Sequence, residues 1–249
     1  MLANVTEKFP RARDPMVFPP SVSSYSVSIS AEAIAPMRTA RLALPAALES
    51  ATAGRKIQFL AGRLCAREAI EGLAPGAPEA TLPRDADGCP VWPDGLVGSI
   101  SHTERFATAA VARRCEARGL GVDVEPLMSG ETAAEIARLV ASEDEARRVA
   151  ETAGLNRLEA ITLVFSAKES LFKALYPETR THFDFLDCEV ASLDPAERRF
   201  TIRVGAPFDA VFGAAAFDGR YELAEDEVRT GVLVTPAQAG RPGLIRHAL

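Results

Sequence analysis

The sequence predicts an α+β fold in which two sub-cores meet near residue 120. Helical and extended patterns follow one another in the order helix, strands, helices, strands, which is typical of that class. The 249 residues, 47% apolar and 25% charged, can form one large domain or two small ones that share a core. We therefore expect an N-terminal subdomain at residues 1–120 and a C-terminal subdomain at residues 121–249.

The N-terminal half is predicted to hold one long helix and several short strands. Apolar residues recur at three-and-four spacing over residues 48–70, which predicts an amphipathic helix. The first 30 residues read as irregular, with a strand favoured in the serine-rich run at 21–30, and the prolines and glycines of residues 75–98 predict a long ordered loop. Short strands are expected at residues 97–101, 106–112 and 120–125.

The C-terminal half is predicted to be helical first and extended afterwards. Amphipathic patterns predict an acidic helix over residues 131–152 and a second helix over 157–176, whose buried stripe includes Phe165 and Phe172. Strands are expected at residues 185–193, 199–204 and 228–235, the first two joined by a turn at 194–197.

The charge balance and the hydropathy pattern exclude several classes of partner. A formal net charge of -6 and a pI near 5.3 give no global field for nucleic acid, whose binding depends on clustered Lys and Arg. The chain shows neither the apolar core of a secretory signal nor the ~18 consecutive apolar residues of a membrane span. Its four cysteines are far apart and include no C-x-x-C pair. We expect a cytoplasmic protein with no nucleic-acid partner and no transmembrane segment.

Two acids near the middle of the chain are the first candidates for chemistry. Alternate side chains of a strand share a face, so Asp123 and Glu125 project together while Val122 and Val124 point to the core. Paired carboxylates repel each other unless a cation lies between them, and oxygen ligands at this spacing suit Mg²⁺ with a substrate phosphate. Taken alone, the segment is also compatible with a solvated edge strand that carries two ordinary acids.

Lysine is scarce in this chain, and two of its four lysines lie in one predicted helix. The other 24 basic side chains are arginine, and an ammonium differs from a guanidinium in being a compact charge that can give up a proton. Glu169 and Lys173 lie one turn apart on one helix face, with Lys168 beside them in sequence. An exposed pair at that spacing is commonplace and worth about 0.3–0.5 kcal/mol. Its interest is that Glu169 would add a third carboxylate to the two acids of the strand.

Basic side chains and one histidine offer groups for an anion. Arg55 and Arg63 are eight residues apart and so about 80° apart around a helix, where guanidinium groups can bind phosphate oxygens bidentately. His102 follows a strand end between the hydroxyls of Ser101 and Thr103, and can donate a hydrogen bond to a phosphate. An ordinary surface helix and a structural histidine are the alternatives. Together with the acids, these residues predict a combined metal and phosphate site.

Four blocks of the sequence, at residues 55–63, 90–102, 121–125 and 165–173, keep the order and spacing of a known family. They resemble the 4'-phosphopantetheinyl transferases, and most closely the enterobactin synthase component D branch of the Sfp type. The resemblance implies a pseudo-dimer of two similar α/β subdomains with coenzyme A bound between them. Thr103 departs from the Cys or Ser that the family has after the histidine.

The resemblance also implies roles for individual residues. Asp123, Glu125 and Glu169 hold Mg²⁺ against the diphosphate of coenzyme A. Glu169 is further expected as the general base and Lys173 as the group that stabilises the leaving charge. The implied binding residues for coenzyme A are Arg55, Arg63, Arg84, Ser101, His102, Lys168 and Lys173.

The implied reaction is Mg²⁺-dependent transfer of the 4'-phosphopantetheine arm of coenzyme A to a serine of an apo carrier protein, with release of 3',5'-ADP. The carrier is a peptidyl, aryl or acyl carrier of siderophore, nonribosomal peptide or polyketide biosynthesis, and the enzyme is expected to be a monomer. Two alternatives stay open at this point. One is a Mg²⁺-dependent phosphohydrolase that uses the same acids, and the other is a non-catalytic carrier-binding accessory subunit.

Overall fold

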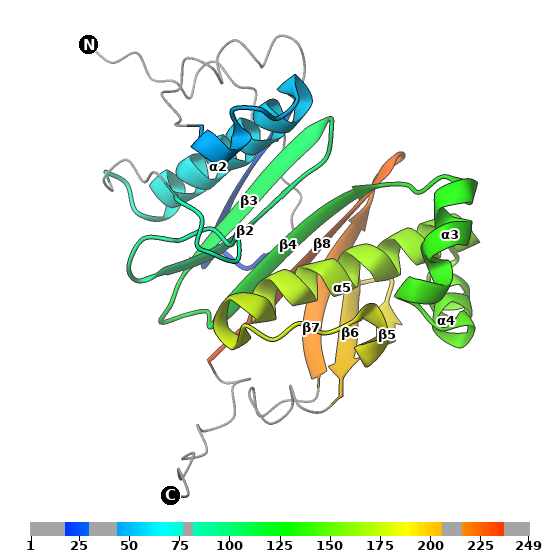
Figure 1. Ribbon diagram of the computed structural model, residues 1–249. Helices are drawn as coiled ribbons and strands as arrows, with labels where there is room; N and C mark the ends of the chain where they lie inside the picture. The colour runs from blue at the N-terminus through cyan, green and yellow to red at the C-terminus, as the bar shows by residue number, and fades with distance from the viewer. Residues whose placement is uncertain (1–17, 30–43, 77–81, 206–215, 237–249) are drawn as a thin grey trace, which may run out of the picture.

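Two antiparallel sheets, each covered by one long helix, make up the computed structural model of the chain (Figure 1). The structure describes residues 18–29, 44–76, 82–205 and 216–236, so the first 17 residues, expected to be irregular, lie outside it. This arrangement confirms the predicted α+β class with two sub-cores. The exact division of the chain at residue 120 stays a prediction.

The bounds of most elements lie within a few residues of the predicted ones. The described helices are α2 (Ala53–Leu73), α3 (Gly130–Val140), α4 (Glu143–Ala153) and α5 (Arg157–Thr179), with 3₁₀ turns η2 (Ala46–Leu48) and η3 (Phe185–Asp187). The strands are β1 (Val22–Ser28), β2 (Leu96–His102), β3 (Phe106–Arg113), β4 (Gly119–Pro126), β5 (Cys188–Asp194), β6 (Arg199–Val204), β7 (Ala216–Leu223) and β8 (Glu227–Val234). None of the helices in the described part of the chain is long and apolar enough to cross a membrane.

The N-terminal half packs α2 on a sheet of order β1-β3-β2 (Figure 1). Thr52 caps the helix, because its hydroxyl accepts a hydrogen bond from the backbone N–H of Arg55. The apolar face that includes Leu64 and Cys65 is buried in one cluster with Val111 of β3. Burial of this face fixes the rotation of α2 and so decides which of its basic residues can reach the rest of the molecule.

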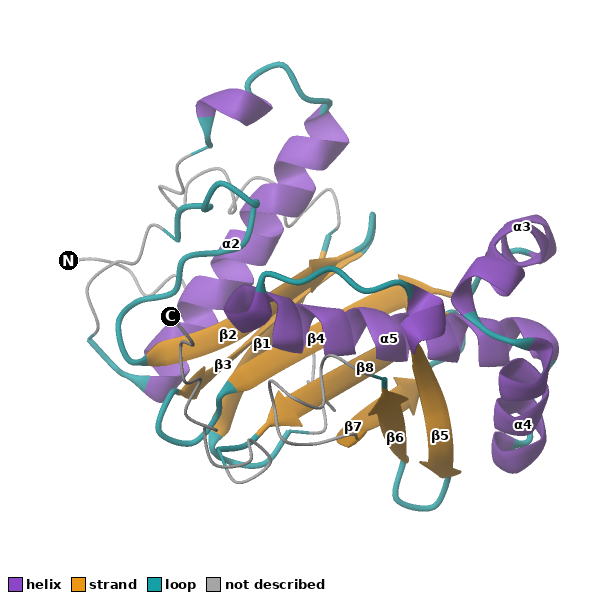
Figure 2. Cartoon of the chain, turned by 60° about the horizontal axis from the view of Figure 1, so that its bottom comes forward, coloured by secondary structure: helices purple, strands orange, loops and turns teal. Residues whose placement is uncertain are grey.

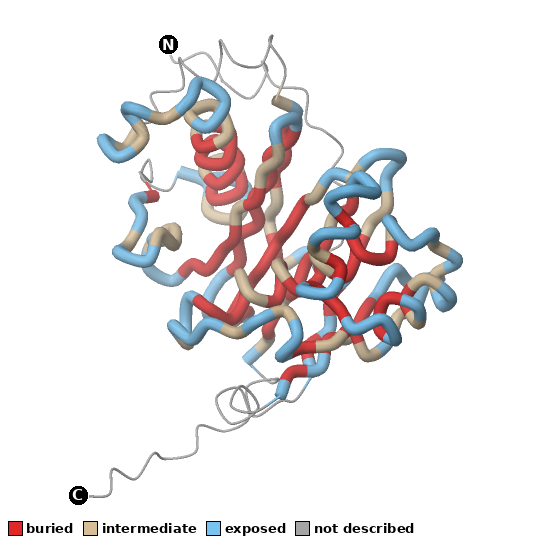
Figure 3. The backbone as a smooth tube through the Cα atoms, turned by 45° about the vertical axis from the view of Figure 1, so that its right-hand side comes forward, coloured by how far each residue is buried: buried red, intermediate tan, exposed pale blue. Residues whose placement is uncertain are grey.

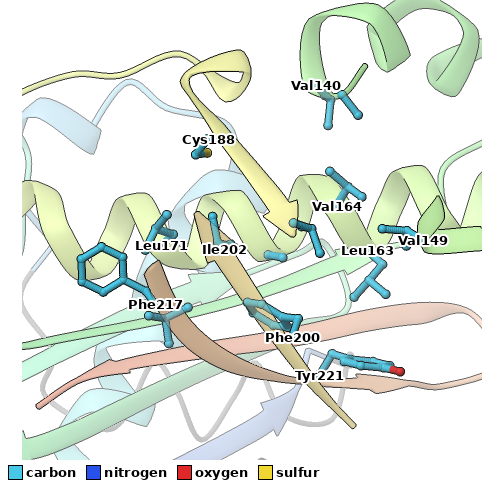
Figure 4. Packing of buried hydrophobic residues seen from close by; sticks show 14 of the residues in the cluster. Val140, Val149, Leu163, Val164, Leu171, Cys188, Phe200, Ile202, Phe217 and Tyr221 are labelled. Atoms are coloured by element: carbon cyan, nitrogen blue, oxygen red, sulfur yellow. The ribbon is translucent and has the colours of Figure 1, made fainter. Parts of the chain in front are cut away.

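The C-terminal half lays α5 along a sheet of order β4-β8-β7-β6-β5. A capping box begins the helix: the Asn156 side chain accepts from the backbone N–H of Glu159, whose carboxylate accepts from the backbone N–H of Asn156. Leu171 of α5 belongs to the same apolar cluster as Ile202 and Phe217 of the strands, and Figure 4 shows these side chains between helix and sheet.

The two sheets meet where β2 runs beside β4 (Figure 2). Side-chain hydroxyls make this joint: the backbone N–H groups of Val122 and Val124 donate to Ser99 Oγ at 3.0 Å and to Ser101 Oγ at 3.3 Å. A small apolar cluster around Leu120 also contains residues of both halves. The strands at the centre of the molecule are accordingly buried along much of their length (Figure 3).

Strand β4 lies directly against α5 because it carries two glycines. A Cβ atom at Gly121 would lie 1.8 Å from the carbonyl oxygen of Ser170, and one at Gly119 would lie 2.3 Å from that of Ala174. Any side chain at either position would push the strand off the helix. The close approach brings the acids of β4 next to the polar residues of α5.

Two features of the C-terminal half differ from the prediction. The helix expected over residues 131–152 is interrupted, because the Ser142 hydroxyl accepts from the backbone N–H of Glu145 and begins α4 as a new helix. Strand β7 is not predicted at all. It alternates buried residues such as Phe217 and Tyr221 with exposed polar ones, and its Asp, Gly and Glu residues are poor strand formers.

A buried ion pair holds the helical end of this half together. Lys168 is 1% exposed, and its ammonium donates to Glu145 Oε2 at 2.9 Å and to the carbonyl oxygens of Val140 and Phe185 at 2.8 Å each. All three N–H donors of the ammonium are thereby used. The other oxygen of Glu145 accepts from the backbone N–H of Val190 at 2.7 Å. One side-chain pair therefore ties α3, α4, η3 and β5 to α5.

Replacing Lys168 by Met is expected to lower the free energy of unfolding by about 3–5 kcal/mol, because Glu145 would remain as a buried charge without its cation. Urea denaturation followed by circular dichroism measures the loss. The double variant Lys168→Met/Glu145→Gln should be more stable than the single one. The matched control is Arg157→Met, which breaks the exposed pair of Arg157 with Glu143 and should cost under about 1 kcal/mol. A Lys168→Met variant as stable as this control would contradict the structural role of the pair.

Candidate active site

A pocket of about 490 Å³ lies between the two halves of the molecule. Helix α2, strand β2 and the segment at residues 84–90 line one side, and α5 lines the other. Six of the predicted site residues line it, namely Arg55, Arg63, Arg84, His102, Glu169 and Lys173. The structure therefore brings together groups from three of the four sequence blocks, and the fourth, on β4, adjoins them through Lys173.

Asp123 of β4 forms the buried acidic corner of this site. It is 1% exposed, and its Oδ1 accepts hydrogen bonds from Lys173 Nζ at 2.6 Å and from Ser101 Oγ at 3.0 Å. Its Oδ2 is also buried and has no hydrogen-bond partner among the described residues. A buried carboxylate oxygen without a donor is costly, so this atom is suited to a cation.

The other two acids are held in an environment that disfavours their charge. Burial, followed by repulsion from Asp123, raises the pKa of Glu125 to about 7, and Glu169 adds to the effect. Burial also raises the pKa of Glu169, with Lys173 opposing the shift and Asp123 adding to it. Burial acts against the charge of Lys173, yet the three acids together raise its pKa. The charged forms of both glutamates are therefore disfavoured, and with a pKa of about 7 Glu125 is only partly ionised at neutral pH.

Cations and a neutral histidine occupy the other end of the pocket. Burial lowers the pKa of His102 to about 4, and repulsion from Arg55, Lys173 and Arg84 contributes, so the imidazole is neutral at pH 7. The Arg55 guanidinium lies 3.1 Å from His102 Nε2. Because a guanidinium can only donate, Nε2 accepts and the ring proton lies on Nδ1.

Arg63 is the buried cation of this end. Its side chain lies over the ring of Phe59 at 4.6 Å and is 7% exposed, and burial and Arg84 lower its pKa to about 10. Its Nε has no hydrogen-bond partner within the described ranges. The other two basic residues of α2 do not line the pocket, since Lys56 donates to the carbonyl oxygen of Glu49 and Arg67 pairs with Glu68. The cations that face the pocket therefore repel one another, and an anion would relieve that repulsion.

A set of residues that sequence reasoning missed closes the pocket at the end of α5. Arg180 pairs with Asp85 at 2.7 Å and with Asp87 at 2.9 Å, so it ties the 84–90 segment to the helix. Tyr176 and His182, with ring centroids 4.7 Å apart, line the same end. No local pattern marks the Arg180 pairs, because they join parts of the chain more than 90 residues apart.

Two predicted binding residues do not line the pocket. The prediction that Lys168 binds coenzyme A is wrong, because its ammonium is buried on another face of α5. All three of its N–H groups donate to Glu145 and to two backbone carbonyl oxygens. Ser101 is buried, and its hydroxyl contacts Asp123 instead of facing the pocket. Thr103, the departure from the family pattern, accepts hydrogen bonds from the backbone N–H groups of Arg105 and Phe106 in the turn after β2.

The acidic corner fits a divalent cation in its chemistry. The unpartnered oxygen of Asp123 and the raised pKa values of Glu125 and Glu169 all indicate carboxylates that lack positive charge. Among the described residues no three acidic, His or Cys side chains are arranged as a ready-made metal cluster, and Lys173 supplies the one cation that touches Asp123. Ligation by all three acids therefore requires side-chain adjustment.

Replacing Glu125 by Gln should stabilise the metal-free protein more at pH 8 than at pH 5. The folded-state pKa of about 7 lies above the ordinary value of 4.5, so the contribution of Glu125 is favourable at low pH and is lost as the pH rises through 7. Urea midpoints in the presence of EDTA measure this difference. The control Glu197→Gln, at an exposed turn, should change stability equally at both pH values. Equal gains for Glu125→Gln at the two pH values would contradict the raised pKa.

Two family models together match nearly the whole described region. The model of the 4'-phosphopantetheinyl transferase N-terminal domain matches residues 44–112, and that of the 4'-phosphopantetheinyl transferase superfamily matches residues 119–224. The first covers α2 and the basic end of the pocket, and the second covers the acids and α5. Together they match more than half of the chain.

Individual relatives agree with the family models. The 4'-phosphopantetheinyl transferase Svp of Streptomyces mobaraensis is 39% identical over 186 residues, which are 74% of this chain and 73% of that protein. Enterobactin synthase component D of Salmonella typhimurium is 39% identical over 147 residues (59% of this chain, 58% of the relative), and PptT of Mycobacterium tuberculosis is 34% identical over 141 (55% and 59%). The chain thus spans less than two thirds of the latter two. The resemblance seen in the four sequence blocks is confirmed, and the chain belongs to the 4'-phosphopantetheinyl transferases.

Proposed function

We propose that the chain transfers the 4'-phosphopantetheine arm of coenzyme A to a serine of an apo carrier protein, with Mg²⁺ bound and 3',5'-ADP released. The observation that carries the proposal is the division of charge in one pocket. Arg55, Arg63 and Arg84 gather at one end, and Glu169 lines the other end, where Asp123 and Glu125 adjoin the pocket beside Lys173. A substrate that carries several phosphates, together with a divalent cation, matches both ends.

The cationic end binds phosphate of coenzyme A. The guanidinium groups of Arg55 and Arg63 donate charge-assisted hydrogen bonds to phosphate oxygens, and Nε of Arg63 gains the acceptor that it lacks in the described structure. His102 can add a donor, since its neutral ring carries a proton on Nδ1 and gains a second one when an anion raises its pKa. In line with the family resemblance, we assign this end to the 3'-phosphate.

The acidic end holds the reacting diphosphate. Asp123, Glu125 and Glu169 are the residues that would hold Mg²⁺, which supplies charge neutralisation at the phosphoryl oxygens. Lys173 lies beside Asp123 with 27% of its side chain exposed, so its ammonium can also reach a substrate oxygen. The diphosphate would then lie between the arginines of the cationic end and the Mg²⁺ and Lys173 of the acidic end.

The transfer requires one proton movement and one exchange of bonds at phosphorus. The serine hydroxyl oxygen of the carrier forms a bond to the phosphorus that bears the pantetheine arm, and the bond from that phosphorus to the bridging oxygen breaks. Glu169 lines the pocket and has a raised pKa, which suits a general base for the serine proton. Lys173 stabilises the negative charge that develops on the 3',5'-ADP oxygen.

The relatives suggest the kind of pathway. Enterobactin synthase component D is the name of several relatives, so we propose a carrier of siderophore, nonribosomal peptide or polyketide biosynthesis. The expected monomeric state, cytoplasmic location and lack of a nucleic-acid partner stay predictions.

Incubation with coenzyme A, Mg²⁺ and an apo peptidyl or aryl carrier domain should add one phosphopantetheine group to the carrier, detected by mass spectrometry. Asp123→Asn should lower the rate more than about 100-fold, because it removes a metal-binding charge without changing side-chain size. The matched control Asp218→Asn, on the exposed face of β7, should transfer at the normal rate. Release of phosphate from coenzyme A without any carrier would favour the phosphohydrolase alternative. An unmodified carrier and intact coenzyme A would favour the accessory subunit.

Replacing Arg55 by Met should raise the KM for coenzyme A about 10- to 100-fold, since a hydrogen bond to a charged group is worth about 1.5–3 kcal/mol. The KM for 3'-dephospho-coenzyme A should stay unchanged, because that substrate lacks the phosphate that Arg55 binds. Lys56→Met, one residue along the same helix and outside the pocket, is the control. An equal rise with both substrates would place Arg55 away from the 3'-phosphate.

A further inference from the structure

We propose that Ser101 is a positioning residue that orients Asp123 for the metal ion, and that it does not bind coenzyme A. This inference rests on the proposed Mg²⁺-dependent function. Ser101 is 5% exposed, and its hydroxyl points from β2 across the joint between the two halves to Asp123 of β4. Ser101 is not among the described residues that line the pocket.

The hydrogen bonds of Ser101 leave only one assignment for its proton. The hydroxyl lies 3.3 Å from the backbone N of Val124, 3.2 Å from Lys173 Nζ and 3.0 Å from Asp123 Oδ1. The first two groups can only donate, so they use the two lone pairs of the hydroxyl oxygen. The hydroxyl proton must then go to Asp123 Oδ1, which is the only acceptor of the three.

This arrangement decides which carboxylate oxygen is left for a metal ion. Asp123 Oδ1 accepts from both Ser101 and Lys173, whereas Oδ2 has no donor among the described residues. Rotation about the terminal bond of an aspartate is soft, so a carboxylate held by one flexible ammonium could turn. The second donor on Oδ1 comes from a short side chain on a strand, and it locks the rotation with Oδ2 directed away from both donors.

Ser101 also fixes this oxygen relative to the phosphate-binding end. His102 follows Ser101 on β2. The Ser101 hydroxyl accepts a hydrogen bond from the backbone N–H of Val124, which lies between Asp123 and Glu125 on β4. The Ser101 hydroxyl thus joins the strand that carries the histidine to the strand that carries the acids. Loss of the hydroxyl should loosen the metal site while leaving each half folded.

The chain supplies a matched control in Ser99. It lies two residues earlier on β2, is also 5% exposed, and accepts from the backbone N–H of Val122 at 3.0 Å. Among the described residues Ser99 makes no hydrogen bond to a carboxylate, whereas Ser101 makes one to Asp123. Ser99→Ala therefore removes only a hydrogen bond between β2 and β4. Ser101→Ala removes such a hydrogen bond together with the contact to Asp123.

The test is a Mn²⁺ titration of the whole protein in the presence of coenzyme A and without a carrier, measured by calorimetry. Ser101→Ala should weaken Mn²⁺ binding about 10- to 100-fold, the range for residues that orient a metal ligand. Ser99→Ala should stay within about threefold of the wild type. Ser101→Thr, which keeps the hydroxyl, should restore most of the affinity. Urea denaturation should show similar losses of stability for the two alanine variants.

The outcomes separate this inference from the proposed function. If the wild type binds Mn²⁺ and Ser101→Ala binds it as well as Ser99→Ala does, Ser101 only joins the strands and the positioning role is wrong. If the wild type binds no Mn²⁺ in the presence of coenzyme A, the metal-dependent function fails and the inference fails with it. If Ser101→Ala raises the KM for coenzyme A while Mn²⁺ binding is unchanged, Ser101 acts on the substrate instead.

Discussion

The site depends on the confinement of β4 between β2 and α5. On one side, two serine hydroxyls of β2 accept hydrogen bonds from the backbone N–H groups of Val122 and Val124. On the other side, the carbonyl oxygen of Ser170 lies within 1.8 Å of where a Cβ atom of Gly121 would be. A strand held so closely can place an acidic side chain within 2.6 Å of a helix lysine and 3.0 Å of a serine from the other half. Without the glycine, or without the hydroxyl joint, the distances between these three groups would change.

The confined strand creates an electrostatic conflict that substrate can resolve. Buried carboxylates and buried guanidinium groups each disfavour their own charged form, as the pKa of Glu125 at about 7 and that of Arg63 at about 10 indicate. The two ends do not neutralise each other, because the described structure has no ion pair between Arg55, Arg63 or Arg84 and the three acids, and Lys173 is the cation that pairs with Asp123. A phosphate with a divalent cation supplies a negative charge to one end and a positive charge to the other. Stability given up in the free protein is a common feature of functional sites.

The parts of this picture that local geometry controls could be predicted from the sequence. Strand alternation put Asp123 and Glu125 on one face, and a four-residue spacing put Glu169 and Lys173 about 40° apart on one helix. The same helix rule separates Lys168 from Lys173 by about 140°, so one pocket could not take both, and scarcity of lysine was a poor guide to the role of Lys168. The ion pair of Arg180 with Asp85 could not be predicted, because it joins distant segments of the chain and neither segment carries a distinctive sequence pattern. Strand β7 was missed because its register partners, and not its own propensities, make it a strand.

The two lysines of α5 show how burial and partners decide between a structural and a chemical role. The ammonium of Lys168 has three acceptors and no exposed side-chain surface, so it has no donor to offer a ligand. The ammonium of Lys173 contacts Asp123 and Ser101, and more than a quarter of its side chain is exposed. It therefore keeps a donor for the substrate while it neutralises the buried acid before any metal ion binds. A guanidinium fork would spread its charge over a plane that does not fit between a serine hydroxyl and one carboxylate oxygen. The compact ammonium can serve both partners from one point, and this physical difference accounts for a lysine at position 173 in a chain that otherwise uses arginine.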